Sequence, residues 1–285
     1  MRKFFKLAVW LATAMVLQGG IYFYLDQVLL APASSFEVGG DTGEPDTVTS
    51  GKVYYSRDHR YMALVKTDRV EIYAMPNKKL VRTVEMKDKQ VSYFKWLDDR
   101  DLALMGLYET VAGHTYATLT QLFPQEGVHE ISTKIDQLPL GSKITDVAYS
   151  TATNVIYIQV KTAPNIYRIY RTDANHNLTR IQLNTSRIGR ISTMFDRDCL
   201  IYDDLTHNTV NIREGNGSWR VISPPGAKYR LVGVDHENNI YITRLNQDGL
   251  GESIYRGRLQ VGFTHDRDLK TPMDARDLKL SDITG

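Results

Sequence analysis

The sequence predicts an all-β protein built from repeated four-stranded sheets. A strand–turn–strand pattern recurs five times along the 285 residues. Aligned on the first residue of the second strand, the copies are 40, 53, 44 and 41 residues apart, close to the period of a four-stranded propeller blade. Aromatic residues make up 10% of the chain, including 17 Tyr, which favours strands. The five copies are residues 53–65, 94–105, 147–158, 192–202 and 232–242.

The turns inside these copies share their chemistry. Four of them place Asp or Asn between the two strands, and the fifth, at 151–154, has Thr and Asn. Such side chains bond their own backbone and favour tight turns. The four turns are Asp58-His59-Arg60, Asp98-Asp99-Arg100, Asp196-Arg197-Asp198 and Asp235 to Asn239.

Each copy is followed by two further apolar runs, which we expect to be a third and a fourth strand. The expected pairs are 70–74 with 80–84, 115–123 with 128–132, 166–171 with 178–183, 209–213 with 218–222, and 253–255 with 258–263.

The second strand of the first copy is apolar on both faces. Tyr61, Ala63 and Val65 lie on one face, and Met62 and Leu64 on the other. A strand covered on one side alternates, whereas a strand between two sheets does not. The sequence therefore predicts a β-propeller of about five four-stranded blades. If residues 35–50 and 264–285 pair, they supply a sixth blade. A two-sheet sandwich is the alternative.

The first copy carries a family resemblance. Ser56-Arg57-Asp58-His59-Arg60-Tyr61-Met62-Ala63-Leu64-Val65, followed by Val70-Glu71-Ile72-Tyr73, resembles the repeat of the WD-repeat and TolB-like propeller superfamily. The chain departs from that pattern, because it has no Trp-Asp dipeptide and no Gly-His signature, and His59 replaces the usual turn glycine. The resemblance implies a fold and a binding surface, with no reaction attached.

The amino terminus predicts a membrane anchor. Arg2, Lys3 and Lys6 precede 19 uncharged residues, Leu7 to Leu25, about enough helix to span a bilayer. The positive-inside rule leaves the amino terminus in the cytoplasm and the rest outside. Residues 1–30 are then the transmembrane helix and 31–50 a linker rich in Gly, Pro and acids, while 51–285 form the propeller. A cleaved signal peptide ending near Ala31-Pro32-Ala33 is the alternative.

Charge and cysteine content exclude some classes of protein. The net charge of +2 resides in residues 1–34, so residues 35–285 are close to neutral. A nearly neutral domain lacks the positively charged surface that binds nucleic acid. The single Cys199 excludes an intramolecular disulfide.

No catalytic, cofactor-binding or metal-binding residue is predicted. Gly215–Trp219 lacks the spacing of a nucleophile elbow, and Cys199 lies in an apolar strand, where a thiol is inert. Asp173–Asn177 begins like a calcium loop but lacks the required Gly and terminal acid. His265–Asp268 is interpreted as a solvated loop, because adjacent strand residues point to opposite faces.

The central channel is the remaining candidate for a ligand site. The expected inner strands place one polar residue each near their starts, and these are Lys52, Ser92, Asp146, Ser192 and Arg230. Only one is a carboxylate, so no ring of metal ligands is expected. The cations beside Asp146 either bind an anion or are ordinary channel groups.

We therefore expect a membrane-anchored, extracytoplasmic propeller in a bacterial envelope that binds a protein or an envelope component without catalysis. The longest insertion, Tyr108 to Gln125, is a candidate interface, unless it is an extended hairpin of its blade. The alternative is a small-ligand-binding or hydrolytic propeller that uses the channel. A third possibility is an accessory subunit of a membrane complex, in which the anchor matters most.

Overall fold

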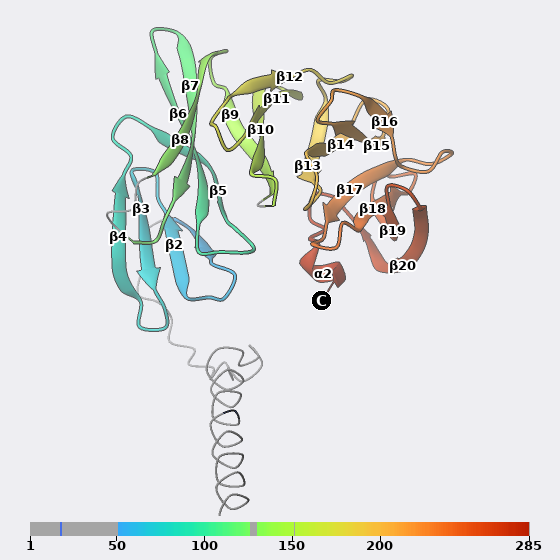
Figure 1. The fold of residues 1–285 in the computed structure, drawn as a ribbon, viewed down its shortest axis with the longest axis horizontal. Coiled ribbons are helices and arrows are strands. Elements are labelled where there is room, and N and C mark those ends of the chain that lie inside the picture. Colours follow the sequence, from blue (N-terminus) through green and yellow to red (C-terminus); the bar gives the residue numbers. More distant parts are fainter. Residues whose placement is uncertain (1–17, 19–50, 126–129, 151, 285) are drawn as a thin grey trace, which may run out of the picture. The chain divides into compact units, whose positions relative to one another are not determined.

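The computed structural model describes Gln18 and residues 51–125, 130–150 and 152–284. From residue 51 onward, the described residues form five four-stranded antiparallel sheets in a β-propeller arrangement, followed by a short helix (Figure 1). The strands of the first three sheets are β1 Lys52–Tyr55, β2 Tyr61–Val65, β3 Arg69–Ala74 and β4 Lys79–Glu85; β5 Gln90–Trp96, β6 Ala103–Val111, β7 His114–Leu122 and β8 Ile131–Leu138; and β9 Lys143–Ser150, β10 Val155–Ala163, β11 Ile166–Thr172 and β12 Thr179–Ile181. The fourth and fifth sheets are β13 Ile188–Thr193, β14 Cys199–Asp204, β15 Thr209–Glu214 and β16 Trp219–Val221; and β17 Tyr229–Val234, β18 Ile240–Leu245, β19 Gly251–Arg258 and β20 Gly262–Met273, with α2 at Ser281–Thr284.

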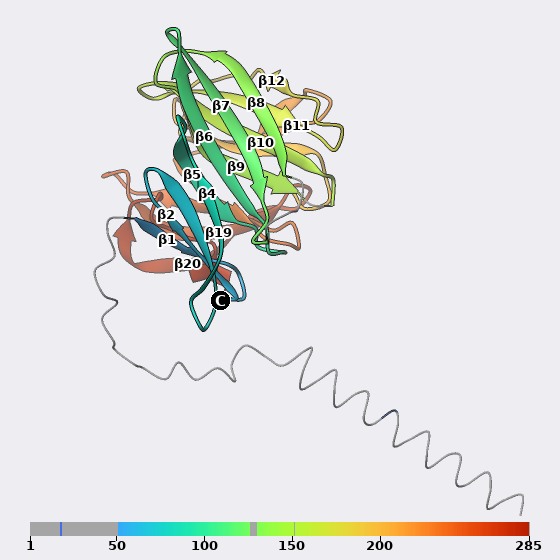
Figure 2. The same cartoon turned by 90° about the vertical axis from the view of Figure 1, so that its left-hand side faces the viewer.

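Within each sheet, every strand pairs with the next strand along the chain. This meander needs only short turns, and the predicted Asp and Asn residues supply them. In the turn between β17 and β18, for example, Asp235 Oδ1 accepts hydrogen bonds from the backbone amides of Glu237 and Asn239. Figure 2 shows the longest hairpin, β6 and β7, from its broad side. Each of the five predicted repeats forms one four-stranded sheet, so this prediction is confirmed.

Successive sheets pack face to face and bury the core between them. The inner strands meet in chain order, β1 with β5, β5 with β9, β9 with β13 and β13 with β17. The second strand of a sheet serves two interfaces, because its side chains alternate. In β6, Met105 packs in the cluster shared with the first sheet, whereas Leu104 packs in the cluster shared with the third. Because both faces of the second strand are buried, its side chains are apolar on both faces, as the sequence showed.

The carboxyl-terminal segment covers the far face of the fifth sheet. Leu278 and Ile283 are buried in one cluster with Val232, Tyr241 and Ile254. The expectation that residues 264–285 help to form a sixth blade is wrong. Residues up to Met273 complete the outer strand of the fifth sheet, and α2 follows. Among the described residues, no hydrophobic cluster joins the first sheet to the fifth.

Two outer strands differ from their predicted bounds. The strand expected at 128–132 is β8, which runs from Ile131 to Leu138. The strand expected at 258–263 is β20, which begins at Gly262 and continues to Met273, while Arg258 belongs to β19. Both outer strands are polar, so pairing with the neighbouring strand determines their extent, and hydrophobicity does not.

The predicted anchor at residues 1–30 lies, apart from Gln18, outside the described residues, and so does the linker at 31–50. Within the described part of the chain, no helix combines the length and the apolar character needed to cross a membrane.

Candidate functional site

A cavity of about 690 Å³ lies where the inner strands of four sheets approach the carboxyl-terminal segment. The second to fifth sheets each supply part of its wall, and residues Leu278–Ser281 and Thr284 supply the remainder. Its polar and aromatic lining residues include Lys95, Asp98, Asp99, Asp146, Tyr149, Arg190, Ser192, Thr193, Phe195, Asp235, His236 and Lys279. This volume is within the usual range for a small-molecule pocket.

Asp146, in the wall of this cavity, bridges two inner strands. It lies on β9, where Oδ1 accepts from the backbone amide of Val147 at 2.9 Å and Oδ2 accepts from that of Ile191, on β13, at 3.3 Å. Burial raises the pKa of Asp146, although the two amides favour its charged form. The carboxylate therefore joins the third and fourth sheets, and both of its oxygens already have partners.

Arg190 is the main cation of the cavity wall. Its Nη1 donates to the backbone carbonyl oxygen of Val232 at 2.8 Å, and Nη2 donates to that of Arg276 at 3.1 Å. The guanidinium thus holds the fourth sheet, the fifth sheet and the carboxyl-terminal segment together. Arg190 makes no ion pair among the described residues, although its charge favours the ionised forms of the nearby Asp146 and Asp203. Its guanidinium is therefore the group of the cavity wall that would attract an anion.

The rim of the cavity carries two aromatic rings. Phe195 is 40% exposed and packs edge to face with His236 at a centroid distance of 5.9 Å. The backbone of Phe195 is fixed on both sides, because its amide donates to Asn238 Oδ1 at 2.7 Å and its carbonyl accepts from Ser150 Oγ at 2.5 Å. The rim is therefore an exposed aromatic pair on rigid turns.

Acidic and basic groups of the second and third sheets line another part of the same cavity. The hydroxyl of Tyr149 accepts from the backbone amide of Asp98 at 2.7 Å, and Lys95 lies 3.4 Å from Asp98. Asp99, whose Oδ2 accepts from Arg100, has a buried Oδ1 without a hydrogen-bond partner. The cavity thus carries both signs of charge as well as an aromatic pair.

The five channel residues named from the sequence are only partly brought together. Asp146 and Ser192 line the central cavity. Lys52 and Ser92 line a second cavity, of about 530 Å³, between the first and second sheets. Arg230 lies elsewhere and donates to Asn208 Oδ1 at 2.7 Å.

Sequence reasoning missed Arg190, Lys95 and the Phe195–His236 pair. The only signal for the rim was its position in the Asp-containing turns. For Arg190, which precedes the expected strand at 192, there was no local signal.

The other sequence candidates are structural. Cys199 is fully buried, and burial raises its thiol pKa to about 12. Gly215–Trp219 forms a hairpin turn in which Ser218 Oγ donates to Asn216 Oδ1. Asp173 caps its own turn by accepting from the amides of Asn175 and Asn177. His265 and Asp268 contact each other on exposed strand β20, so the expected loop is a strand.

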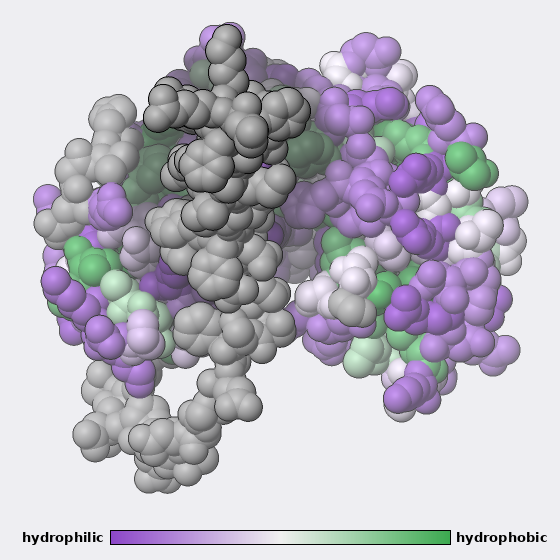
Figure 3. All heavy atoms as spheres, turned by 60° about the horizontal axis from the view of Figure 1, so that its bottom comes forward, coloured by the Kyte–Doolittle hydropathy of each residue, from purple (hydrophilic) through white to green (hydrophobic). Residues whose placement is uncertain are grey.

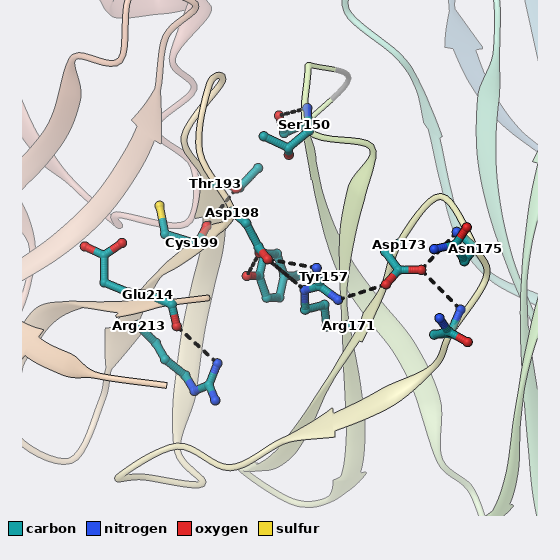
Figure 4. A network of polar contacts seen from close by, with 12 residues as sticks. Ser150, Tyr157, Arg171, Asp173, Asn175, Thr193, Asp198, Cys199, Arg213 and Glu214 are labelled. Carbon is teal, nitrogen blue, oxygen red and sulfur yellow. Dashed lines mark hydrogen bonds and ion pairs between the residues drawn. The ribbon is translucent and has the colours of Figure 1, made fainter. Parts of the chain in front are cut away.

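Asp198 is the centre of a polar network between the third and fourth sheets (Figure 4). Its Oδ1 accepts from the Tyr157 hydroxyl at 2.5 Å, and its Oδ2 accepts from Arg171 Nη2 at 2.8 Å. Burial opposes ionisation of Asp198, but the hydrogen bonds from Arg171 and Tyr157 outweigh it and lower its pKa. The network links the third sheet to the fourth, and it lies away from the cavity lining.

Within the described residues, no three His, Cys, Asp or Glu side chains converge closely enough to hold a metal ion. The acids of the cavity wall are spread over several sheets, so their arrangement suits contact with an extended surface or a ligand with several polar groups.

Comparisons with known proteins give a likeness of fold. No protein-family model matches the chain, and no curated protein matches it. Among solved structures, Porphyromonas gingivalis dipeptidyl peptidase 4 is similar over 78% of this chain and 39% of its own, with a TM-score of 0.53 and 10% identity. The likeness is one of fold alone. Dihydro-heme d1 dehydrogenase NirN, in complex with DHE, is similar over 78% of this chain and 47% of its own, with a TM-score of 0.50 and 16% identity. The chain spans less than half the length of either protein.

Proposed function

We propose that the chain is a membrane-anchored, extracytoplasmic propeller of the WD-repeat and TolB-like kind that binds a protein partner or an envelope component without catalysis. The binding surface is the turn face around the central cavity, which we define as Lys95, Asp98, Asp99, Phe195, Asp235 and His236. The anchor follows from the amino-terminal sequence, and the interaction role rests on the geometry of this face.

The exposed Phe195–His236 pair carries the proposal. An aromatic residue that is 40% exposed and held by two backbone hydrogen bonds loses little conformational entropy on binding. Aromatic anchors in a setting of polar residues are enriched among residues that dominate binding energy. The charged groups of both signs on the turn face supply orientation and selectivity against wrong partners.

The test is capture by the full chain from a detergent extract of the source cells. Phe195→Ala with His236→Ala is expected to lose the captured partner, while Val221→Ala, at a site on β16 that is 48% exposed, retains it. Equal capture by both variants contradicts the proposal for this face. Capture that requires only the amino-terminal 50 residues favours the accessory-subunit role of the anchor.

The second candidate is a small-ligand propeller that uses the cavity itself. The guanidinium of Arg190, which makes no ion pair among the described residues, favours a ligand with an anionic group. Arg190→Gln would then abolish the thermal stabilisation that a library of small carboxylates and phosphates gives to the full chain. The absence of any stabilising compound would count against this candidate.

A further inference from the structure

Each of the five inner strands begins with a basic residue. In every sheet, a lysine or an arginine is the first residue of the inner strand or immediately precedes it. None of these five side chains makes an ion pair among the described residues. Four of the residues are exposed and the one in the second sheet is half-buried. The five residues are Lys52, Lys89, Lys143, Arg187 and Lys228.

The five cations share one end of the propeller, opposite the turn face. The last residues of β5, β9, β13 and β17 line the central cavity together, with the turns that follow β5, β13 and β17. The first residues of β1 and β5 line the second cavity together. The inner strands therefore run in the same direction, and their starts lie at the end away from the central cavity.

The carboxylates at this end do not cancel the cations. Lys66 and Arg69 pair with Asp68 and Glu71, so these four charges balance. Besides the five cations, the connections and hairpin ends here carry two further cations and four further carboxylates. The near-neutral charge of the whole domain thus conceals a basic end, with seven cations against four carboxylates. The additional groups are Lys87, Lys161, Glu85, Asp88, Glu109 and Asp248.

Two loop tips at the same end expose apolar side chains. Val111, at the tip of the β6–β7 hairpin, is 54% exposed, and Leu140, in the turn before β9, is 67% exposed. Next to them, Lys143 Nζ lies 4.6 Å from the centroid of the Tyr108 ring. On the side of the molecule that Figure 3 shows, apolar side chains form scattered patches among hydrophilic ones. We define the start face as the five cations together with Val111 and Leu140.

The chain enters the propeller at the start face. Lys52 is the first residue of β1, and the predicted linker from the predicted anchor comprises the 20 residues 31–50. A linker of this length spans at most about 70 Å when it is fully extended. Because the linker is attached at the start face, it holds this end nearer to the membrane than the turn face.

We propose that the start face lies on an anionic phospholipid surface, with Val111 and Leu140 at the level of the headgroups. Cations that are spread over five sheets suit a surface of many charges, whereas one bound phosphate needs donors that converge on it. Apolar tips beside lysine and tyrosine suit the interfacial region of a bilayer. The inference rests on the anchored topology of the proposed function, and it leaves the turn face pointing away from the bilayer and open to a partner.

A nucleic acid is the other polyanion that a basic end could attract. Phosphate contacts there come from Lys and Arg, and single-stranded bases stack on exposed aromatic rings. The start face instead exposes Val111 and Leu140, which are aliphatic. Aliphatic tips favour the bilayer, because they gain free energy on leaving water for its apolar interior.

The test uses the full chain with one fluorescent label. Val111→Cys is labelled with NBD, whose emission shifts to shorter wavelength when the dye leaves water, while the native Cys199 is fully buried and does not react. In vesicles of equal parts phosphatidylcholine and phosphatidylglycerol, the emission should shift, and lipids with a spin-labelled headgroup should quench it. Neither effect is expected in vesicles of phosphatidylcholine alone, nor for a label at Asp196→Cys, on an exposed turn at the other end.

Reversal of three start-face charges tests whether the cations cause the contact. Lys143→Glu, Arg187→Glu and Lys228→Glu, combined in the labelled chain, should return the emission to its value in neutral vesicles. Each cation near an anionic surface contributes a factor of about five, so the ratio of bound to free start face should fall by at least about 100-fold.

The matched control reverses three exposed cations at the opposite end. Arg57→Glu, Lys79→Glu and Arg197→Glu should leave the shift unchanged. Thermal unfolding followed by circular dichroism establishes that both triple variants are folded. High salt should weaken the response of the chain without charge substitutions, since exposed charges are screened.

Flotation of the labelled chain with neutral vesicles tests the anchor separately, so a failed anchor is distinguished from a failed start face. An equal shift in neutral and anionic vesicles, a shift that persists in the start-face variant, or no shift in a chain that floats overturns the proposal. A shift caused by a single-stranded oligonucleotide and not by anionic vesicles assigns the start face to nucleic acid and overturns it as well.

Discussion

Asp203 Oδ1 accepts a hydrogen bond of 2.5 Å from the backbone amide of Leu231. The bond joins the second strand of the fourth sheet to the inner strand of the fifth. Oδ2 accepts from the amide of Arg190 at 3.1 Å, so one buried side chain fixes two inner strands. Asp146 joins the third and fourth sheets in a similar way. Buried carboxylates on backbone amides are thus a recurrent way of locking the inner strands.

Stability should fall as the pH rises toward neutrality, because of Asp203. Burial raises the pKa of Asp203 to about 7, against an ordinary value of 3.8. The folded state therefore binds a proton that the unfolded state releases between these two values. The contribution to stability is fully present below about pH 4 and is lost as the pH rises to about 7, with a total of up to about 4 kcal/mol. Urea unfolding at pH 5, 6, 7 and 8 measures it.

Asp203→Asn removes this titration. The unfolding free energy of this variant should vary less with pH than that of the wild type. The difference in unfolding free energy between wild type and variant should narrow as the pH rises. Asp196→Asn, at an exposed turn position, is the control and should keep the wild-type profile. An identical pH dependence in Asp203→Asn and wild type would contradict the assignment.

Loss of Asp198 should loosen the third sheet from the fourth. Asp198→Ala removes hydrogen bonds from Tyr157 and Arg171 and leaves both donors facing a gap. Hydrogen bonds to charged groups are worth about 1.5–3 kcal/mol, and partial exposure of this site places the expected cost near about 2 kcal/mol. Asp196→Ala, two residues earlier in the same turn, should cost much less. Equal unfolding midpoints for the two variants would show that Asp198 does not hold the third and fourth sheets together.

Strand–turn–strand units were predictable because their signals are local. Alternation and Asp-containing turns located β2, β3 and β14 to within one or two residues. By contrast, β20 contains His265-Asp266-Arg267-Asp268 and is a strand only because β19 offers a partner. Pairing between strands is not visible in the polarity of one segment.

The site was less predictable for the same reason. Arg190 enters the cavity wall because two carbonyl oxygens from other segments hold its guanidinium. Leu278 and Leu280 alternate like a weak strand, yet they cover the fifth sheet beside a helix. Only the tertiary arrangement shows which polar residues converge, so the sequence could name Asp146 and Ser192 but not Arg190 or Lys95.

Cys199 should be unreactive in the folded protein. Its side chain is fully buried, and burial raises its pKa to about 12, so almost no thiolate forms near neutral pH. A thiol reagent at pH 8 should modify the chain only at the rate of unfolding, and fully in denaturant. Rapid modification of the native protein would show that the strand position of this residue is wrong.

Gly106 should not tolerate a larger residue. A Cβ atom at this position would lie 2.9 Å from Tyr93 Cβ and 3.0 Å from Ile144 Cβ, where the second and third sheets approach closely. These atoms lie next to the backbone and cannot rotate away, so Gly106→Ala forces the sheets apart. Overpacking of this kind costs about 1–3 kcal/mol. Chemical denaturation measures the loss, and a stabilised variant would contradict the close approach.

The carboxyl-terminal segment should stabilise the fifth sheet in the way that an adjacent blade would. Leu278 is 3% exposed and Ile283 is 4% exposed against Val232, Tyr241 and Ile254. Ile283→Ala leaves a cavity on the fifth sheet, and such substitutions cost about 2–5 kcal/mol in a well-packed core. Lys279→Ala, on the exposed side of the same segment, is the matched control. If both variants unfold like the wild type, the segment does not hold the fifth sheet. If Ile283→Ala also weakens capture through Phe195 and His236, the segment supports the turn face as well, because it forms one wall of the same cavity.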